Sequence, residues 1–516
     1  MTIREALQTG IGHHVAGRLR EAEAVYRQIL NQQPNHSDSL HLLGVIASQT
    51  GNHAAAIELI GNAIKGSPNS AEYHSNLGLA LSGLGRMNEA LAAHRRAVAL
   101  QPNTASFQNN LGNCLEAMGQ TDHAVECFRK AIMYKGDYPD PHYNLGNIHR
   151  NAGRFEEAVQ RYRHALALRP TWSMAQSNLG LSLSSLGRYD EALVMHRQAL
   201  SLLPEDPMAH WNLALILLRM GDLARGLHEY EWRWKARELK LNRDQVQGPQ
   251  WNGSELAGRR ILLYCEQGFG DTIQFIRYVP MVAARGGRIT VVCQSDLRRL
   301  LERMGGVDRW LSEFPAPSEY DTQCPLASLP SVMMTTLSNI PSTIPYLKPD
   351  ETLSQKWKDR LQATGGGLKV GLSWAGKPAN PNDRNRSVEL RQLAALAQVQ
   401  NVTFFSLQKG DAAAQPAPAG LNLTDWTSEL TDFDETAALV ANLDLVITVD
   451  TAVAHLAGAM GKPAWVLIPF VPDWRWMLNR TDTPWYPTLQ LFRQEKAGDW
   501  KPPIARLAKQ LSELKM

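Results

Sequence analysis

One short stretch of this chain places an acid, a hydroxyl and an imidazole where a strand should run into a helix. Asp450 and Thr451 follow the apolar run LDLVITV, and His455 lies in the Ala-rich segment that comes next. In an open α/β sheet, ligands bind beyond the carboxyl ends of the strands, where helix N-termini offer free N–H groups to phosphate. We therefore expect these three residues to meet a nucleotide. The alternative is that Asp450 or Thr451 caps the helix and that His455 is an ordinary helix histidine.

A polar loop follows a second strand of the same region. The strand KVGLSWAG, which contains Ser373, runs into the loop KPANPNDRNRSVEL. Such a loop at the carboxyl end of a strand is where phosphate contacts belong. Lys377, Arg384 and Arg386 are candidate phosphate ligands, and we group Ser373 with them. The alternative is a solvated basic loop.

A similar strand-to-helix turn occurs earlier in the chain. The apolar run ILLYC leads into Gly268, Gly270 and Asp271, and then into the predicted helix IQFIRYVPMVAARGG. Strand, glycine turn and helix are typical of a Rossmann-like unit. The third glycine of a dinucleotide fingerprint is missing, because residue 273 is Ile. From its position alone, Asp271 is a candidate site residue or a helix cap.

The residues in these stretches resemble a known family. The pattern D-T-x-x-x-H-L-A-x-A after LDLVITV resembles the donor-binding segment of the bacterial heptosyltransferases, which are two-Rossmann (GT-B) glycosyltransferases. The resemblance implies that the segment holds a nucleotide sugar. It also implies that Asp271, which matches the family's glycine and aspartate after the first strand, is the catalytic base for an acceptor hydroxyl. Arg386 is the closest match to the family's pyrophosphate-contacting basic residue.

A further resemblance concerns the strand VTFFSLQ, which ends in Gln408 and Lys409. This pair resembles the nucleotide-contacting Gln and Lys of O-linked N-acetylglucosamine transferase, although the spacing is not identical. The resemblance implies that Lys409 is a charge partner for the leaving phosphate.

The sequence also contains a D-x-D at residues 432–434, a pattern that binds a metal in the other major glycosyltransferase fold. Because it precedes the helical segment ETAALVANL, we predict that Asp432 or Asp434 is a helix N-cap. A GT-B enzyme can stabilise its leaving group with basic side chains and helix dipoles. We therefore expect neither a metal nor any other cofactor.

The N-terminal part of the chain is an internal repeat. Prolines keep a 34-residue spacing at positions 34, 68, 102, 170 and 204. Turn glycines recur with the same period, each followed five residues later by a small residue, at 17/22, 51/56, 85/90, 119/124, 153/158, 187/192 and 221/226. Small residues let two antiparallel helices approach closely, and the glycines make the turns. This is the tetratricopeptide (TPR) signature, and about seven helical hairpins should stack into a superhelix.

An asparagine recurs just before the Leu-Gly or Leu-Ala pair of five repeats, at Asn76, Asn110, Asn144, Asn178 and Asn212. An amide carries a donor and an acceptor, so a ladder of amides can bond the backbone of an extended polypeptide. The ladder resembles that of O-linked N-acetylglucosamine transferase, which implies a peptide-binding groove. The alternative is that these are consensus residues bonding neighbouring helices.

Composition excludes several classes of protein. A net charge of +3 with 20% charged residues argues against a nucleic-acid binder or a polybasic membrane anchor. The five cysteines are scattered and odd in number, which argues against a disulfide framework or a zinc site. The most apolar region, residues 443–470, is interrupted by charged residues, so we expect no transmembrane helix. We expect a cytoplasmic protein.

The expected fold is an α-helical TPR superhelix followed by an α/β GT-B-like region of two Rossmann-like lobes. The expected boundaries are a TPR array at 1–238, a linker at 239–258, an N-terminal lobe on the acceptor side at 259–350 and a C-terminal lobe on the donor side at 351–516. The predicted function is an inverting glycosyltransferase that moves a sugar from a nucleotide donor to a hydroxyl on a protein or peptide held by the TPR groove. The alternative is a TPR scaffold with a catalytically inactive GT-B-like binding module.

Overall fold

The computed structural model describes residues 2–239, 241, 245–380 and 382–514. It forms two compact units, Met1–Leu186 and Gly187–Met516. The division lies inside the predicted repeat array, so the last repeats belong to the same unit as the sheets. Residues 240 and 242–244 of the predicted linker lie outside the described residues.

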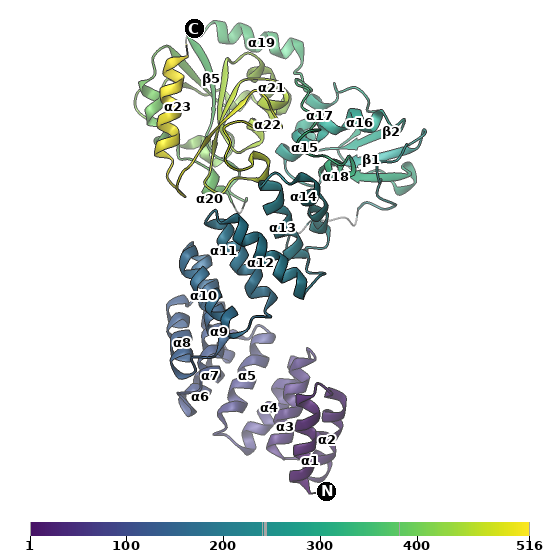
Figure 1. The fold of residues 1–516 in the computed structure, drawn as a ribbon, viewed down its shortest axis with the longest axis vertical. Coiled ribbons are helices and arrows are strands. Elements are labelled where there is room, and N and C mark those ends of the chain that lie inside the picture. The colour runs from purple at the N-terminus through teal and green to yellow at the C-terminus, as the bar shows by residue number, and fades with distance from the viewer. Residues whose placement is uncertain (1, 240, 242–244, 381, 515–516) are drawn as a thin grey trace. The chain divides into compact units, whose positions relative to one another are not determined.

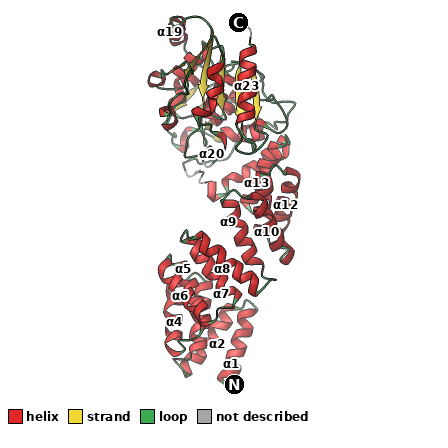
Figure 2. Cartoon of the chain, turned by 90° about the vertical axis from the view of Figure 1, so that its left-hand side faces the viewer, coloured by secondary structure: helices red, strands yellow, loops and turns green. Residues whose placement is uncertain are grey.

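The first unit consists of helices joined by short turns (Figure 2). They are α1 (Ile3–Val15), α2 (Leu19–Gln32), α3 (Ser37–Gln49), α4 (His53–Gly66), α5 (Ala71–Gly83), α6 (Met87–Leu100), α7 (Ala105–Ala117), α8 (Thr121–Tyr134), α9 (Pro139–Asn151), α10 (Phe155–Leu168) and α11 (Ser173–Ser185). The second unit begins with α12 (Tyr189–Leu202), α13 (Pro207–Arg219) and α14 (Leu223–Tyr230). The TPR-like helical array predicted from the sequence is therefore confirmed.

The repeat residues do what their spacing predicted. The turn glycines take φ values from 73° to 89°, at Gly17, Gly51, Gly85, Gly119, Gly153, Gly187 and Gly221. The glycines of four Leu-Gly pairs, at 44, 78, 112 and 146, face a large side chain sixteen residues later: a Cβ added to Gly112 would lie 2.6 Å from Phe128, and one added to Gly146 would lie 2.6 Å from Tyr162. The helices of each hairpin approach closely because no side chain separates them there.

The second unit contains two parallel sheets (Figure 1). The four-stranded sheet has the order β3-β2-β1-β4, with β1 (Arg260–Tyr264), β2 (Arg288–Val292), β3 (Arg309–Leu311) and β4 (Thr322–Pro325). The six-stranded sheet has the order β10-β9-β8-β5-β6-β7, with β5 (Leu368–Ser373), β6 (Val402–Ser406), β7 (Leu423–Thr424), β8 (Leu445–Val449), β9 (Ala464–Ile468) and β10 (Leu489–Arg493). We call the parts built on them the first and second sheet regions.

The order of the strands locates a crevice in each sheet. In the first sheet, β1 lies between β2 and β4, and in the second, β5 lies between β6 and β8. The connections on the two sides of β1, and of β5, therefore run to opposite faces of the sheet. Ligands of open α/β sheets bind at such switch points, beyond the carboxyl ends of the strands. The loops after β1, β5 and β8 are the ones placed for binding.

Helices cover both faces of the second sheet. Alternate strand residues pack either against α23 and the 3₁₀ helix η6, or against α19, α21 and α22. The helices of the two sheet regions are α15 (Phe269–Phe275), α16 (Val279–Ala283), α17 (Ser295–Leu301), α18 (Leu329–Val332), α19 (Glu351–Gln362), α20 (Asp383–Arg386), η6 (Leu390–Gln398), α21 (Phe433–Ala441), α22 (Ala452–Ala459) and α23 (Lys501–Glu513). The long helix predicted after Asp271 is broken into α15, a 3₁₀ turn and α16, with Pro280 in the first turn of α16.

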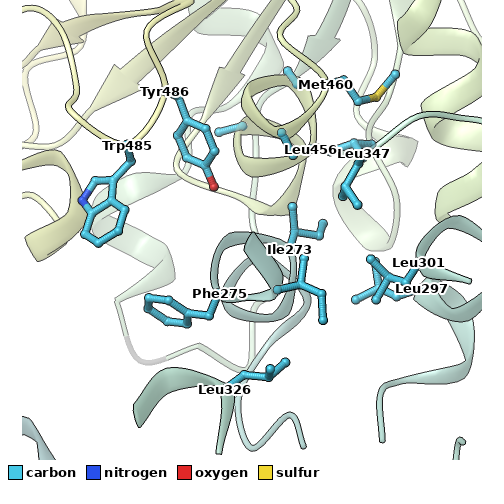
Figure 3. Packing of buried hydrophobic residues seen from close by; sticks show 14 of the residues in the cluster. Ile273, Phe275, Leu297, Leu301, Leu326, Leu347, Leu456, Met460, Trp485 and Tyr486 are labelled. Atoms are coloured by element: carbon cyan, nitrogen blue, oxygen red, sulfur yellow. The ribbon is translucent and has the colours of Figure 1, made fainter. Parts of the chain in front are cut away.

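The two sheet regions share one hydrophobic core. Ile273 and Phe275 of α15 lie in the same buried cluster as Leu456 of α22 and Trp485 of the C-terminal segment (Figure 3). Because these side chains are almost fully buried, the regions are held together by apolar packing as well as by polar contacts. In the described part of the chain, no helix is long and apolar enough to cross a membrane.

Candidate functional site

The start of α15 and the start of α22 meet where the two sheet regions join. A Cβ added to Gly270 would lie 2.7 Å from Cδ2 of His455 and 3.6 Å from Cα of Ala452. Any side chain at residue 270 would therefore push the two helices apart. The glycine of the Gly-Asp pair lets α15, which carries Asp271 at the next position, pack closely against α22.

Asp271 is held by contacts from both sheet regions. One carboxylate oxygen accepts the backbone N–H of Gly268 at 2.9 Å, which is the helix cap that we weighed as an alternative role. The other oxygen pairs with Arg475, which also contacts Gln274 and pairs with Asp473 at 2.9 Å. Asp271 thus caps α15 and takes part in an ion-pair cluster. Its side chain keeps 24% of its surface exposed, whereas that of Arg475 keeps 8%.

The charges of this cluster set one another's pKa values. Burial raises the pKa of Asp271, Arg475 opposes that rise, and the carboxylate of Asp473 adds to it. Burial acts to lower the pKa of Arg475, but the carboxylates of Asp473 and Asp271 raise it above its usual value. The pKa of Asp473 is lowered because Arg475 outweighs the effect of burial. A carboxylate with a raised pKa and partial exposure is a better proton acceptor than an ordinary aspartate.

Asp450 and Arg386 are adjacent on the second sheet region. The guanidinium of Arg386 donates to the backbone carbonyl of Asp450 at 2.9 Å and pairs with Asp383 at 3.3 Å. Burial, with the charge of Asp473 adding to it, raises the pKa of Asp450 to about 6, and Arg386 opposes the rise. Arg386, which lies between β5 and β6, is therefore held at the carboxyl end of β8.

Thr451 stands at the N-cap position of α22, but it does not cap the helix with its side chain, which was one of the two alternatives from the sequence. Its side chain makes no capping bond and lies 3.2 Å from the hydroxyl of Thr448 instead. The first-turn N–H groups of this eight-residue helix are therefore not taken up by the Thr451 hydroxyl.

His455, one turn into α22, is buried. Its Nδ1 lies 3.0 Å from the Tyr486 hydroxyl, and its ring stacks on Trp476. Burial, with help from Arg475, lowers the pKa of His455 to about 3, so the imidazole is neutral near pH 7.

Gln408 and Ser373 lie at the ends of neighbouring strands and bond each other. The side-chain oxygen of Gln408 accepts from Ser373 at 3.3 Å and from the backbone N–H groups of Trp374 and Ala375 at 2.9 and 2.8 Å. Its amide nitrogen donates to the carbonyls of Ala375 and Lys409. The Gln408 side chain therefore fixes the turn after β5.

The two predicted lysines lie in the loops that follow β5 and β6. Lys409 donates to the backbone carbonyl of Thr427 at 2.6 Å. Lys377 is exposed in the loop after β5, four residues beyond the strand. The donor-binding role of both lysines stays a prediction.

The asparagine ladder of the first unit bonds neighbouring repeats. Asn144 donates to Asn109 at 3.0 Å and to Asn113 at 2.7 Å, and Asn178 donates to Tyr143 at 3.0 Å. Asn110 and Asn76 make the equivalent contacts, with Ser75 at 3.1 Å and His41 at 2.8 Å. Asn212, in the second unit, is buried. These bonds are the helix-to-helix contacts that we weighed as the alternative role, and peptide binding by the ladder stays a prediction.

A polar recess of about 460 Å³ opens beside the ladder within the first unit. Asn76 and Asn110 line it, together with hydroxyl and amide side chains and the carboxylate of Glu72. It is large enough to take a few residues of an extended chain or a small polar molecule.

The D-x-D at 432–434 caps a helix, as predicted. Asp432 is the N-cap of α21 and accepts the N–H groups of Asp434 and Glu435 at 3.0 and 2.9 Å. Arg299 of α17 pairs with Asp432 at 2.7 Å, which adds a further polar link between the sheet regions. Within the residues that the structure describes, no group of three or more His, Cys, Asp or Glu side chains is arranged to hold a metal ion.

Sequence reasoning missed Asp473, and it did not pair Arg475 with Asp271. Arg475 pairs with Asp271 from more than two hundred residues away, and Asp473 affects the pKa values of both Asp271 and Asp450. The available signal was the pair of charged residues, Asp473 and Arg475, that alternate with two tryptophans in the segment DWRW. Glu266 was also missed; its buried carboxylate pairs with Arg233 at 3.0 Å.

Comparison with known protein families finds matches in both halves of the chain. Residues 69–132 and 138–205 match a tetratricopeptide repeat model, and further TPR models match residues 16–79, 115–153 and 177–237. Residues 389–467 match glycosyltransferase family 9 (heptosyltransferase). The chain carries TPR repeats and a glycosyltransferase family 9 domain. The matched part of this domain includes Asp450, Thr451 and His455, whereas Asp271, Arg386 and Arg475 lie outside it.

Individual relatives share parts of this organisation. Protein FlbA of Caulobacter vibrioides is 29% identical over 320 residues, which are 57% of this chain and 53% of that protein. The chain thus spans about half the length of this curated relative. Among solved structures, a thermophilic TPR protein of Thermus thermophilus is 25% identical and covers 35% of this chain and 99% of its own, with a TM-score of 0.32. The pilus biogenesis factor PilW is 20% identical and covers 42% and 98%, with a TM-score of 0.38.

Proposed function

We propose that the second unit is an inverting glycosyltransferase of the GT-B type, which transfers a sugar from a nucleotide-sugar donor to a hydroxyl acceptor. The observation that carries the proposal is the meeting of α15 and α22 at Gly270, because it brings the helix that carries Asp271 against the helix that follows Asp450 and Thr451. On the second sheet region, Arg386 bonds the backbone carbonyl of Asp450. The match of residues 389–467 to glycosyltransferase family 9 supports the same reaction class.

Asp271 is the base of the proposed reaction. As the acceptor oxygen attacks the anomeric carbon, its proton passes to the Asp271 carboxylate, and the bond between the sugar and the nucleoside diphosphate breaks on the opposite side. A positioned base of this kind contributes on the order of 10² to 10⁴ in rate. The raised pKa and partial exposure of Asp271 suit this role, and Arg475 keeps the carboxylate in one orientation.

The departing diphosphate is stabilised by the second sheet region. Arg386, fixed against the carbonyl of Asp450, supplies positive charge, and the first turn of α22 supplies N–H groups. Lys377 and Lys409 are the further cations of the proposed donor site. No metal is needed for this step, since basic side chains and a helix start can carry the developing charge.

The acceptor is proposed to be a protein or peptide bound by the TPR repeats. TPR surfaces bind polypeptides, and the recess beside Asn76 and Asn110 offers hydroxyls, amides and one carboxylate to an extended segment. The rival proposal, a TPR scaffold with an inactive glycosyltransferase-like module, predicts no turnover. The close approach of α15, the helix that carries Asp271, to α22 favours the enzyme.

Thermal-shift and calorimetric titration with UDP-, GDP-, ADP- and CDP-sugars test the donor site. A ligand at 100 times its Kd stabilises the folded protein by roughly 2.7 kcal/mol, which raises the Tm by a measurable amount. We expect one nucleotide class to bind and the Arg386→Gln variant to bind it at least tenfold more weakly.

Arg391→Gln is the matched control, because it removes an exposed cation from η6, five residues after Arg386, without touching the Asp450 carbonyl. We expect it to bind the nucleotide sugar within about threefold of wild type. Equal losses in the two variants, or the absence of any binding nucleotide, would contradict the proposal.

A further inference from the structure

The last TPR hairpin, α13 and α14, shares the hydrophobic core of the two sheet regions. Ala214 and Leu218 of α13, and Leu223, Leu227 and Tyr230 of α14, are almost fully buried in the same cluster as residues of both sheets. An ordinary TPR hairpin buries its apolar stripe against the neighbouring repeats. This hairpin instead buries much of its stripe against the glycosyltransferase part of the chain.

Tyr230 links the hairpin to the loop that carries Asp271. The amide of Gln267 donates to the Tyr230 hydroxyl at 2.9 Å, and the backbone carbonyl of Gln267 accepts from Gln294 at 2.9 Å. Gln267 directly precedes Gly268, whose N–H is bonded by Asp271. The ring of Tyr230 also packs against Trp474, with 6.2 Å between ring centroids.

Arg219 links the hairpin to the loop that carries Asp473 and Arg475. Its guanidinium donates to the backbone carbonyl of Pro472 at 2.9 Å. It also lies over the ring of Tyr189 in α12, at 5.4 Å from the ring centroid. The carbonyl that Arg219 holds belongs to the residue just before Asp473.

A buried arginine completes the attachment. Arg233, just after α14, pairs with Glu266 of the loop after β1 at 3.0 Å and donates to Ser328 at 2.6 Å. Glu231 accepts from the same Ser328 hydroxyl at 2.9 Å. Because Arg233 has no exposed side-chain surface, this link is rigid and desolvated.

We propose that the last TPR hairpin is a structural part of the transfer site, in which Tyr230 and Arg219 are positioning residues for the two loops that carry Asp271, Asp473 and Arg475. The role of the hairpin in sugar transfer rests on the proposed function, whereas its role in positioning the two loops does not. A protein segment that binds near this hairpin would then act directly on the geometry of the base. The hairpin belongs to the catalytic part of the molecule and not to the recognition part.

Hydrogen–deuterium exchange of the full-length protein tests the positioning without any substrate. We expect Tyr230→Phe to speed exchange of the amides of residues 265–272 by roughly threefold to tenfold, as the loss of one buried hydrogen bond predicts. We expect Arg219→Gln to do the same for residues 472–477. The two effects should be separate, because each variant breaks a bond to a different loop.

Matched controls exist in the first unit. Tyr162 is equally buried, and its hydroxyl donates to Asn147 at 2.7 Å; Arg150 donates to Asn178 at 2.9 Å. We expect Tyr162→Phe and Arg150→Gln to leave exchange at both site loops unchanged. Unchanged exchange in Tyr230→Phe and Arg219→Gln, with far-UV circular dichroism as in wild type, would overturn the proposal.

A kinetic measurement separates positioning from simple destabilisation. In transfer of an isotope-labelled sugar into acid-precipitable protein, we expect Tyr230→Phe to lower kcat by about tenfold and to leave the KM for the nucleotide sugar within twofold. A change in that KM with kcat unchanged would count against the proposal. If no nucleotide sugar is a donor, the proposed function fails while the exchange result still decides the role of the hairpin.

Discussion

The two units of this protein are stabilised in different ways. In the first unit, each contact recurs with the repeat: Gly112 faces Phe128 as Gly146 faces Tyr162, and Asn144 and Asn178 bond the preceding repeat alike. In the second unit, the decisive contacts occur once and join distant residues, such as Arg475 with Asp271. A change in the first unit should therefore act locally, whereas a change at the join of the sheet regions should affect the whole second unit.

This contrast also separates recognition from chemistry. A repeated contact makes a long uniform surface, which suits the binding of an extended partner. A contact that occurs once can fix two groups at a defined distance, which a reaction requires. The following variants compare the two kinds of contact.

The largest expected effect is on catalysis. We expect Asp271→Asn to lower the rate of labelled-sugar transfer by roughly 10²-fold to 10⁴-fold, which is the usual contribution of a general base. The amide can no longer take up the proton of the acceptor hydroxyl. Donor affinity, measured by calorimetry, should change less than threefold.

The control for this variant is Asp444→Asn. The Asp444 carboxylate accepts the backbone N–H of Lys369 at 2.7 Å, at the amino end of β8 and away from the loops of the site. We expect its transfer rate to remain within about threefold of wild type. A rate of Asp271→Asn close to that of Asp444→Asn would exclude Asp271 as the base.

Adding a methyl group to a tight glycine compares the two units directly. We expect Gly270→Ala and Gly112→Ala each to lower the free energy of unfolding by about 1 to 3 kcal/mol, because the new Cβ overlaps His455 or Phe128. In hydrogen exchange, Gly112→Ala should affect neighbouring repeats, and Gly270→Ala should affect both sheet regions.

Gly61 provides the control, since it lies inside α4 and nothing lies within 4 Å of a Cβ added there. We expect Gly61→Ala to be neutral or to stabilise the protein by up to about 1 kcal/mol. A Gly270→Ala variant as stable as Gly61→Ala would mean that α15 and α22 do not meet closely.

Acid sensitivity is the next expected effect. Burial against Gly78 lowers the pKa of His94 from 6.5 to about 4. The folded state therefore binds this proton less readily than the unfolded state, and its stability falls as the pH drops below 6.5. The next repeat has Phe128 in the same place. In denaturant titrations, we expect the free energy of unfolding of His94→Phe, relative to that of wild type, to rise by about 2 kcal/mol between neutral pH and about pH 5. A difference independent of pH would contradict this.

The smallest expected effect is at the ladder. We expect Asn144→Ala to lower the free energy of unfolding by about 1 to 2 kcal/mol, because it removes two hydrogen bonds to the preceding repeat. The measurement is chemical denaturation of the full chain, with Lys135→Ala as a surface control. A loss of less than about 0.5 kcal/mol would leave the ladder asparagines free for a partner.

Elements with a local signal were predictable from the sequence. The 34-residue period predicted the turns at Gly119 and Gly153 and the close helix pairs, because the same residue types do the same task in each repeat. The strands β1, β5, β6 and β8 were predicted from largely apolar runs, and Asp432 was predicted as an N-cap from its place before a helix.

Features that depend on long-range contacts were not predictable. The segment DWRW does not predict that Arg475 pairs with Asp271, because that contact forms only when both sheet regions are folded and packed together. The resemblance of Gln408 to a nucleotide-binding residue gave no hint that its side chain would be taken up by the turn after β5. Likewise, the repeat pattern does not reveal that the last hairpin packs with the sheets, because its sequence period continues unchanged.

Hydrogen exchange during titration with the nucleotide sugar that gives the largest thermal shift tests most directly whether the two sheet regions form one site. We predict that exchange slows in residues 265–272 of the first region and in residues 450–456 of the second, with the same midpoint concentration. Protection of the second region alone would contradict a shared site and would favour a binding module without a base.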